Sequence, residues 1–369
     1  MGSLYDYIKW RGDLTFLENP LNEVDSLIFS LLSYLDLEEI VPNTHESDCI
    51  SIKKAADIFF SRHPDIRKYS MGLIVPKNIV KVFQLLKDTK RFGNVGMKAF
   101  VNKIDLEKEM QFSAVTFLPG DGSTLVTYRG TDDTLVGWKE NFNMSFLPVV
   151  PAQTAATAYL NAASKTSVGP IKVTGHSKGG NLAVYAAVHC EDDVKPRIQA
   201  VWSNDGPGFS KEFLESKDYI KMRRVIKTLV PQSSIIGMLL EHEETYTVIK
   251  SRQAGPFQHD GLTWEVIGGS FVHLKDVTNE CKRIDKTLKA WLCEMSLEQR
   301  EQFVEALYQI LSADHAKTLT DLVSVKNGWL KKSGSLDPQV KKTVQKTLSA
   351  LLEANAKSII SSVKTRLKK

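Results

Sequence analysis

The amino-acid sequence predicts an α/β fold in which a mainly parallel sheet is covered by helices on both faces. Strand-like and helix-like segments alternate between residues 171 and 231, which is the pattern of parallel strands joined by crossover helices. A β-rich hairpin precedes this region at 111–131. Within it, the stretch VTGHSKGGNLAVYAA (173–187) places a serine where a strand turns into a helix.

The composition is that of a globular protein. Hydrophobic residues make up 42% and charged residues 25% of the 369-residue chain, which can form one large α/β domain. The net charge of +5 comes without a basic stripe interleaved with aromatic residues, so no nucleic-acid partner is expected. We see no signal peptide and no apolar run of roughly 18 residues. No cysteine pair is spaced as CxxC, so free thiols and a cytoplasmic location are predicted for a chain with Cys49, Cys190, Cys281 and Cys293.

Three helices are expected before the β-rich region, at 22–36, 51–62 and 77–90. Prolines, which interrupt helices, fall between these segments. The first helix has one apolar face at helical spacing, formed by Val24, Leu27, Ile28, Leu31, Leu32 and Leu35.

The strand signal begins at residue 111, with two β-rich runs joined by the turn sequence GDG (120–122). Ligands of parallel sheets bind beyond the carboxyl ends of the strands, so polar residues that follow a strand are the best site candidates. The further strands are expected at 171–175, 197–205, 224–231, 245–251 and 262–268, and the helices at 137–146, 151–165, 178–189 and 210–219.

From about residue 276 only helical periodicity is visible. We therefore expect a domain over 1–275, N-terminal helices included, and a helical C-terminal extension over 276–369. Residues 321–369 contain eleven Lys or Arg against three Asp or Glu. The last helix could contact an anionic membrane surface, but packing against the domain or a second subunit in a dimer is favoured, because helical amphipathicity mostly reflects packing.

The serine turn has the pattern Gly-x-Ser-x-Gly: Gly175, His176, Ser177, Lys178 and Gly179. A serine hydroxyl attacks a carbonyl only when a base removes its proton. Glycines on both flanks permit the sharp turn that exposes such a nucleophile, and the following helix directs its amides to the same place. A purely structural turn is the alternative; the strand before and the helix after Ser177 favour the nucleophile.

A second donor for a negatively charged oxygen could come from Arg129-Gly130-Thr131, which follows the strand at 125–128. The Thr131 amide, together with its hydroxyl, would then lie beside the Lys178 amide and form an oxyanion hole. On local sequence alone, an ordinary glycine turn at the end of a strand is an equal alternative.

These motifs together resemble a known family. A strand with Arg-Gly-Thr, about 45 residues before a strand with Gly-His-Ser-x-Gly-Gly, resembles the class 3 (fungal-type) lipase branch of the α/β-hydrolases. The stretches at 13–36, 231–241 and 257–266 further resemble a bacterial group of uncharacterised lipase-like hydrolases. The resemblance covers roughly residues 10–275, and implies an α/β-hydrolase fold with Ser177 as nucleophile and Thr131 with Lys178 as oxyanion hole.

In hydrolases of this fold the chain order is serine, acid, histidine. His259 is the preferred base, because it lies in the loop GPFQHDG after a strand and the related group has a matching Gln-His-Asp stretch. His176 more plausibly shapes the turn. The other histidines that follow Ser177 are His273, held in reserve, then His242, and the less suitable His189 and His315.

The acid is assigned to Asp205, which ends a strand in SNDGPGF. Class 3 lipases take their aspartate from the next strand end, but here that place has Ser233 and Ser234 and no carboxylate. A serine hydroxyl or water could orient the histidine instead. Asp205 could also merely cap the helix at 210–219 or brace the turn. Asp260 adjoins His259 and is expected to point elsewhere.

No metal and no cofactor is expected. Asp132 and Asp133 are interpreted as part of a solvated loop, and the acidic run Glu241, His242, Glu243 and Glu244 as a solvated turn. The turn GDG is not followed by a helix and so does not indicate a phosphate site.

The predicted function is a serine carboxylester hydrolase of lipase or esterase type, with a small-molecule ester or lipid as substrate. An acyltransferase or thioesterase that uses the same acyl-enzyme is one alternative. A non-catalytic binding protein with a hydrolase fold is another.

Overall fold

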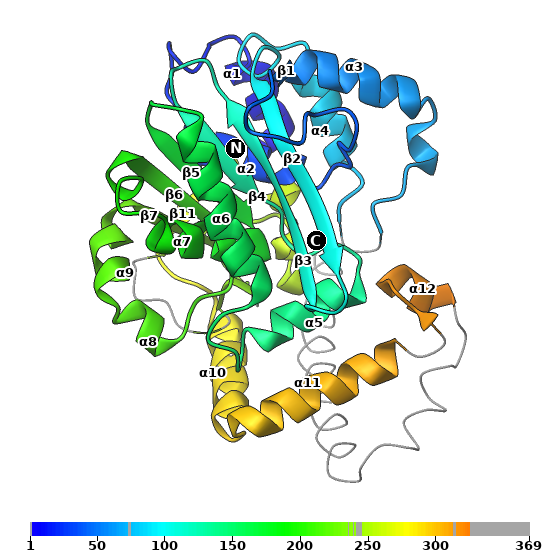
Figure 1. Ribbon diagram of the computed structural model, residues 1–369, viewed down its shortest axis with the longest axis vertical. Coiled ribbons are helices and arrows are strands. Elements are labelled where there is room, and N and C mark those ends of the chain that lie inside the picture. The colour runs from blue at the N-terminus through cyan, green and yellow to red at the C-terminus, as the bar shows by residue number, and fades with distance from the viewer. Residues whose placement is uncertain are drawn as a thin grey trace, which may run out of the picture.

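The computed structural model describes residues 2–72, 75–234, 236–238, 240, 246–312 and 315–324. Its centre is a nine-stranded sheet with the order β1-β2-β3-β4-β5-β6-β7-β8-β11 (Figure 1). The α/β class predicted from the sequence is confirmed. The strands are β1 Ile50–Ser51, β2 Gly96–Asp105, β3 Met110–Leu118, β4 Thr124–Tyr128, β5 Ile171–His176, β6 Ile198–Asn204, β7 Ile226–Pro231, β8 Thr247–Ile249 and β11 His273–Leu274.

The sheet is mixed, with a parallel core. β4 to β8 run parallel, whereas β1 to β4 pair antiparallel, as do β8 and β11. The register pairs Tyr128 of β4 with Gly175 of β5, and His176 of β5 with Asn204 of β6. The carboxyl ends of these three strands are therefore level, and the residues that follow them meet at one edge.

The strand series starts earlier than the sequence predicts. β2 is a ten-residue strand that the sequence analysis missed. Its pairing with β3 shifts register between Lys98 and Val101, and Ala99 has φ 55°. This bulge interrupts the alternation of side chains on which strand prediction depends.

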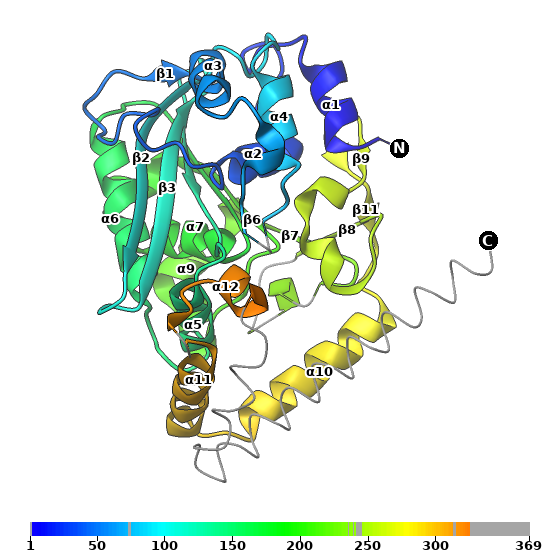
Figure 2. The ribbon, with the colours of Figure 1, turned by 90° about the vertical axis from the view of Figure 1, so that its right-hand side faces the viewer.

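Helices cover both faces of the sheet (Figures 1 and 2). One apolar core lies under the N-terminal helices, and a second lies between the sheet and α6, α7 and α9. Leu125 and Val126 of β4 belong to different cores, because successive strand residues point to opposite faces. The helices on the N-terminal side are α1 Leu4–Arg11, α2 Glu23–Leu32, α3 Ile52–Arg62 and α4 Ile79–Leu86. The helices on the opposite face are α6 Pro151–Lys165, α7 Lys178–His189, α8 Lys211–Leu214 and α9 Lys217–Met222.

Most predicted elements are present, with shorter bounds. α1 was not predicted, although Ser3 and Asp6 form a capping box at its start. The helix expected at 210–219 is two helices, because Ser216 caps a second one. The strand expected at 262–268 is reduced to β9, Val266–Ile267, which pairs with β10, Ser270–Phe271.

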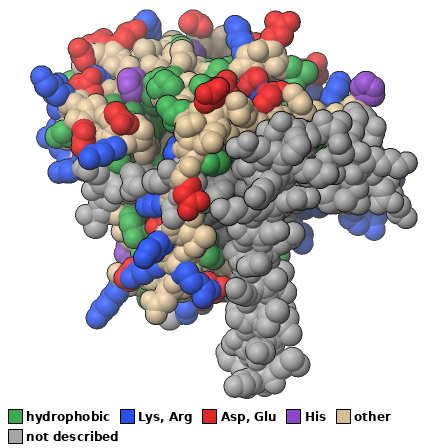
Figure 3. Space-filling view, turned by 90° about the horizontal axis from the view of Figure 1, so that it is seen from below, with side chains coloured by type: hydrophobic (Ala, Val, Ile, Leu, Met, Phe, Trp, Pro, Cys, Tyr) green, Lys and Arg blue, Asp and Glu red, His purple; other side chains and the backbone are tan. Residues whose placement is uncertain are grey.

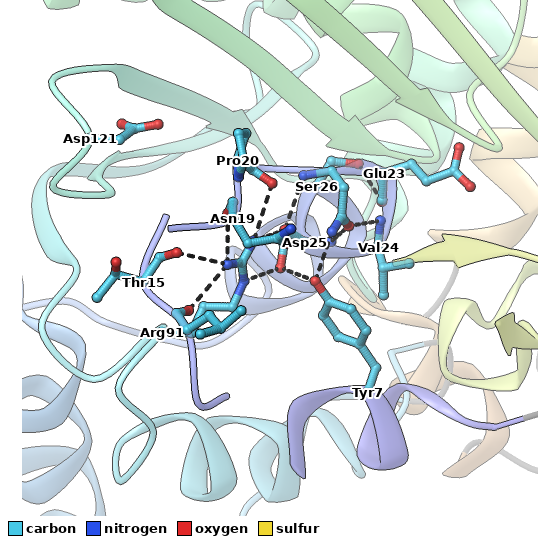
Figure 4. Close-up of polar contacts among 12 residues, drawn as sticks. Tyr7, Thr15, Asn19, Pro20, Glu23, Val24, Asp25, Ser26, Arg91 and Asp121 are labelled. Carbon is cyan, nitrogen blue, oxygen red and sulfur yellow. Dashed lines mark hydrogen bonds and ion pairs between the residues drawn. The ribbon is translucent and has the colours of Figure 1, made fainter. Parts of the chain in front are cut away.

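A buried ion pair joins helix α2 to the segment between α4 and β2 (Figure 4). Both side chains are fully buried: Arg91 Nε and Nη2 donate to the two carboxylate oxygens of Asp25, at 2.9 and 2.6 Å. The Tyr7 hydroxyl donates to Asp25 Oδ1 at 2.8 Å. Arg91 Nη1 donates to the carbonyl of Asn19 at 2.9 Å, and the guanidinium stacks on Phe16. The positive charge of Arg91 and the negative charge of Asp25 thus compensate each other inside the protein.

The C-terminal extension consists of α10 Asn279–Cys293, α11 Leu297–Leu311 and α12 Leu319–Ser324. α11 packs against α5, Leu135–Asn143, and both views draw the two helices together (Figures 1 and 2). The amphipathic helix predicted toward the end of the chain lies outside the described residues. Among the described residues, no helix combines the length and apolar character that a membrane crossing requires.

The surface carries charges of both signs. On the face drawn in Figure 3, the described part shows Lys and Arg side chains as well as Asp and Glu, with hydrophobic side chains between them. This arrangement agrees with the modest net charge of +5.

Candidate active site

Ser177 lies at a strained turn between β5 and α7. Its backbone angles are φ 58° and ψ −132°, far from the usual regions for a residue with a side chain. A Cβ on Gly175 would lie 2.0 Å from the Gly179 carbonyl oxygen, and one on Gly179 would lie 2.2 Å from that of Tyr128. Both flanking positions therefore require glycine. The Ser177 side chain is held at the carboxyl edge of the sheet, where the residue keeps 9% of its surface exposed.

The Arg-Gly-Thr turn after β4 packs directly against this serine. A Cβ on Gly130 would lie 2.9 Å from the Ser177 Cβ. The Thr131 hydroxyl accepts a hydrogen bond from Asn141 Nδ2 at 2.6 Å, which leaves its own proton to donate. Within the described residues, neither the Thr131 amide nor the Lys178 amide has an acceptor. Three donors are thus available near Ser177.

The Lys178 side chain does not enter the site. Its ammonium donates to Glu140 Oε2 at 2.8 Å and to the Gln111 carbonyl at 2.7 Å, and both charged side chains are buried. Burial lowers the pKa of Lys178, and Glu140 opposes that shift. Glu140 also accepts hydrogen bonds from the amides of Gln111 and Ala152. The Lys178 ammonium is therefore engaged in the interior, and the main-chain amide is the part of Lys178 available as a donor beside Ser177.

Asp205 and His259 are brought together at the same edge. Asp205 follows β6 with φ 53°, and its amide donates to the Leu229 carbonyl of β7. His259 ends the 3-10 turn η5, Gly255–His259. His259 Nδ1 donates to Asp205 Oδ2 at 2.7 Å. A carboxylate only accepts, so this contact places the imidazole proton on Nδ1 and leaves the lone pair on Nε2.

The segment after β7, where the sequence has no carboxylate, contributes a serine hydroxyl to the site. Ser234 Oγ donates to Asp205 Oδ1 at 2.5 Å, and accepts from the Gly237 amide at 2.8 Å. The hydroxyl of Ser234 therefore does not replace the acid, as the sequence alternative had it, but supports Asp205. The capping alternative for Asp205 is wrong, because Ser210 caps α8. Asp260 accepts from the Leu262 amide and points elsewhere, as expected.

Asp205→Asn is expected to lower the turnover of any ester substrate by about 10³- to 10⁴-fold at neutral pH, because an amide cannot stabilise the imidazolium and favours the wrong tautomer. Steady-state rates of the two proteins at equal folded concentration provide the measurement. The matched control is Asp260→Asn, which changes an adjacent carboxyl outside this contact. Equal losses in both variants would argue against a special role for Asp205.

His176 braces the histidine loop. Its Nε2 lies 2.8 Å from the His259 carbonyl, and its Nδ1 lies 3.1 Å from the Tyr34 hydroxyl. A carbonyl can only accept, so Nε2 carries the proton and Tyr34 donates to Nδ1. The same Tyr34 hydroxyl packs against Gly130, where a Cβ would lie 2.2 Å from it. One tyrosine therefore ties together the Arg-Gly-Thr turn, the serine turn and, through His176, the histidine loop.

Burial, together with nearby His259, lowers the pKa of His176 from 6.5 to about 3. Between these values the unfolded chain binds a proton that the folded protein does not, so stability falls as the pH drops from about 6.5 toward 3. We expect wild type to lose up to about 1.4 kcal/mol per pH unit more than His176→Asn in that window. Urea unfolding at several pH values measures this. Parallel stability curves would contradict it.

The remaining histidines lie elsewhere. His189 stacks on Tyr185 with ring centroids 4.0 Å apart, and His273 contacts Glu23 at 2.8 Å. His315 belongs to the C-terminal extension, and His242 lies outside the described residues. His259 is held in place by its buried neighbour Gln258, whose carbonyl accepts from Trp264 Nε1.

Ser177 Oγ has no hydrogen bond to any described residue, His259 included. The serine is linked to the histidine loop through its neighbour, because the rings of His176 and His259 lie 4.6 Å apart. Hydrogen bonds between nucleophile and base are often long in free enzymes and shorten when substrate binds. Ser177, His259, Asp205 and the donors near Thr131 share one edge of the sheet.

The loop of Asp132 and Asp133 offers no metal centre within the described part of the chain. The described residues contain no group of three His, Cys, Asp or Glu side chains suited to a metal ion. Asp132 and Asp133 lie in the loop between β4 and α5, as predicted, and both are half-buried there. Asp132 pairs with Arg129 at 2.8 Å, and Asp133 accepts from Thr320. The run from Glu241 to Glu244 lies outside the described residues.

Comparison with known proteins gives a family and a distant likeness to solved structures. The chain matches the Mbeg1-like family over residues 86–309. Among solved structures it is similar to the native Rhizomucor miehei lipase propeptide complex, with 11% identity, coverage of 62% of this chain and 70% of that chain, and a TM-score of 0.35. No curated protein matches the chain. Because the family match spans more than half of the 369 residues, this protein belongs to the Mbeg1-like family.

Proposed function

We propose that this protein is a serine carboxylester hydrolase that acts through an acyl-serine intermediate. The observation that carries the proposal is the 2.7 Å contact between His259 Nδ1 and the buried Asp205 carboxylate, at the sheet edge where Ser177 lies in its strained turn. A buried carboxylate that orients an imidazole beside a serine in a strained strand-to-helix turn is the arrangement that activates a hydroxyl nucleophile.

Acylation begins when Ser177 Oγ attacks the ester carbonyl carbon and His259 Nε2 takes the hydroxyl proton. Asp205 stabilises the imidazolium through the Nδ1 hydrogen bond. The carbonyl π electrons move to the oxygen, which becomes negative and accepts from the Lys178 amide and from Thr131. The tetrahedral intermediate collapses, the bond to the alkoxy group breaks, and His259 returns the proton to the leaving alcohol.

Deacylation repeats these steps with water. His259 removes a proton from water, the hydroxide equivalent attacks the acyl-serine carbonyl, and the same donors bind the oxygen. Collapse releases a carboxylic acid, and Ser177 Oγ recovers its proton from His259. The protein's own side chains and amides supply every catalytic group in these two steps, so the mechanism requires no cofactor.

A panel of nitrophenyl esters from acetate to palmitate tests the proposal and defines the acyl-chain preference. We expect hydrolysis by wild type with one preferred chain length. Adding an alcohol such as glycerol distinguishes the acceptor: a new ester among the products would show acyl transfer instead of hydrolysis. A folded wild-type protein that cleaves no member of the panel, and no thioester, would contradict the proposal.

A further inference from the structure

Helix α5 carries the side chains that support both proposed oxyanion donors. Asn141 donates to the Thr131 hydroxyl at 2.6 Å, and Glu140 holds the Lys178 ammonium at 2.8 Å. The two residues are neighbours on one helix, whose first residue follows Thr131 by only four positions. Any shift of α5 would therefore move the supports of Thr131 and Lys178 together.

The C-terminal extension holds the later part of α5. Lys139, almost completely buried, lies between Glu305 of α11 at 2.5 Å and Glu109 at 2.7 Å. Its ammonium also lies 4.6 Å from the ring centroid of Tyr308. Arg300 Nη1 donates to the Ser145 carbonyl at 2.6 Å. α11 thus contacts α5 through a partly desolvated ion pair, and it contacts the turn after α5 through the Ser145 carbonyl.

The same extension holds the start of α5. The Leu135 amide donates to the Lys317 carbonyl at 2.8 Å, and the Leu319 amide donates to the Asp133 carbonyl at 2.9 Å. The Thr320 amide and hydroxyl both donate to Asp133 Oδ2, at 3.1 and 2.5 Å. Asp133 is two residues beyond Thr131. The extension therefore contacts the chain on both sides of the residues that support the donors.

We propose that the extension over residues 296–312 and 315–321 is an intramolecular clamp that positions the oxyanion hole, with Glu305 and Thr320 as positioning residues. The inference rests on the proposed function, because it concerns the same site. Oxyanion donors act only when they are held in place before the reaction, and a displacement of about 1 Å can cost about a hundredfold in rate. The clamp supplies that rigidity from a segment far from Ser177 in the sequence.

The variants Glu305→Gln and Thr320→Val, alone and combined, test the clamp. We expect kcat to fall about five- to tenfold in the double variant with KM nearly unchanged, because transition-state stabilisation is weakened and ground-state binding is not. Affinity for a boronic acid, which forms a tetrahedral adduct on serine, should fall in parallel. The control is Glu301→Gln, an exposed position on the same helix. An unchanged kcat in the double variant would show that the extension only covers α5. An increased kcat would show that the extension inhibits the enzyme. Either result overturns the proposal.

Hydrogen exchange separates this inference from the proposed function. Amides of residues 131–141 should exchange faster in the double variant than in wild type and the control, while those of β5 and β6 stay unchanged. If wild type shows no ester hydrolysis, the proposed function fails, and exchange alone then decides whether the clamp exists. Unchanged exchange at 131–141 would overturn it even in an active enzyme.

Discussion

Ser177→Ala is expected to lower kcat for the preferred ester by about 10⁴- to 10⁶-fold, the range seen when a serine nucleophile is removed. The hydroxyl forms the covalent bond to the acyl group, and no other hydroxyl occupies the strained turn between β5 and α7. Residual activity would come only from the donors and from substrate binding. Initial rates at saturating substrate measure the loss.

The control for this variant is Ser61→Ala, which removes an exposed hydroxyl from α3. It should retain the wild-type rate, and both variants should unfold at the wild-type denaturant concentration. A rate for Ser177→Ala within about tenfold of wild type would contradict the assignment of the nucleophile, because binding effects alone are of that size.

Arg91→Met is expected to lower the free energy of unfolding by about 3–5 kcal/mol, the cost of leaving one member of a buried ion pair without its partner. The Asp25 carboxylate has no exposed surface, and it would lose both contacts to Arg91. Carbonyls such as that of Asn19 would lose their donor at the same time. The midpoint of urea unfolding, with the slope held constant, measures the change.

Two comparisons sharpen this prediction. Arg67→Met breaks an exposed pair with Asp65 and should leave the midpoint of urea unfolding nearly unchanged, because water and salt screen exposed ion pairs. Adding Asp25→Asn to Arg91→Met should recover part of the lost stability, because the uncompensated charge is removed. Equal losses for Arg91→Met and Arg67→Met would show that the buried network contributes little.

The parts of the fold with regular periodicity could be predicted from the sequence. The helices at α2, α3 and α4 have clear apolar faces, and the alternation from β5 to β7 indicated a parallel core. β2 was missed because its bulge at Lys98 breaks the alternating pattern. α1 was missed although Ser3 and Asp6 form a recognisable capping box, which is a signal that could have found it.

The candidate site was only partly visible in the sequence. The serine turn and the loop of His259 have local patterns, and those residues were singled out. The support of Asp205 by Ser234 depends on the register of β6 and β7, where Asn204 pairs with Leu229, and register between distant strands leaves no local signal.

Other support comes from long-range contacts that no local pattern shows. Tyr34 contacts His176 across 142 residues of sequence. Lys139 contacts Glu305 across 166 residues. Such contacts follow from the packing of helices on the sheet, so the positioning residues could be identified only once the fold was known.

Reaction with a fluorophosphonate tests the central claim most directly, because the reagent phosphonylates only an activated serine. Intact-mass analysis of wild type should show a single adduct, and peptide mapping should place it on Ser177. Ser177→Ala should show none, and His259→Ala should react far more slowly. A folded wild type that stays unmodified, or an adduct that maps to another residue, would contradict covalent catalysis by Ser177.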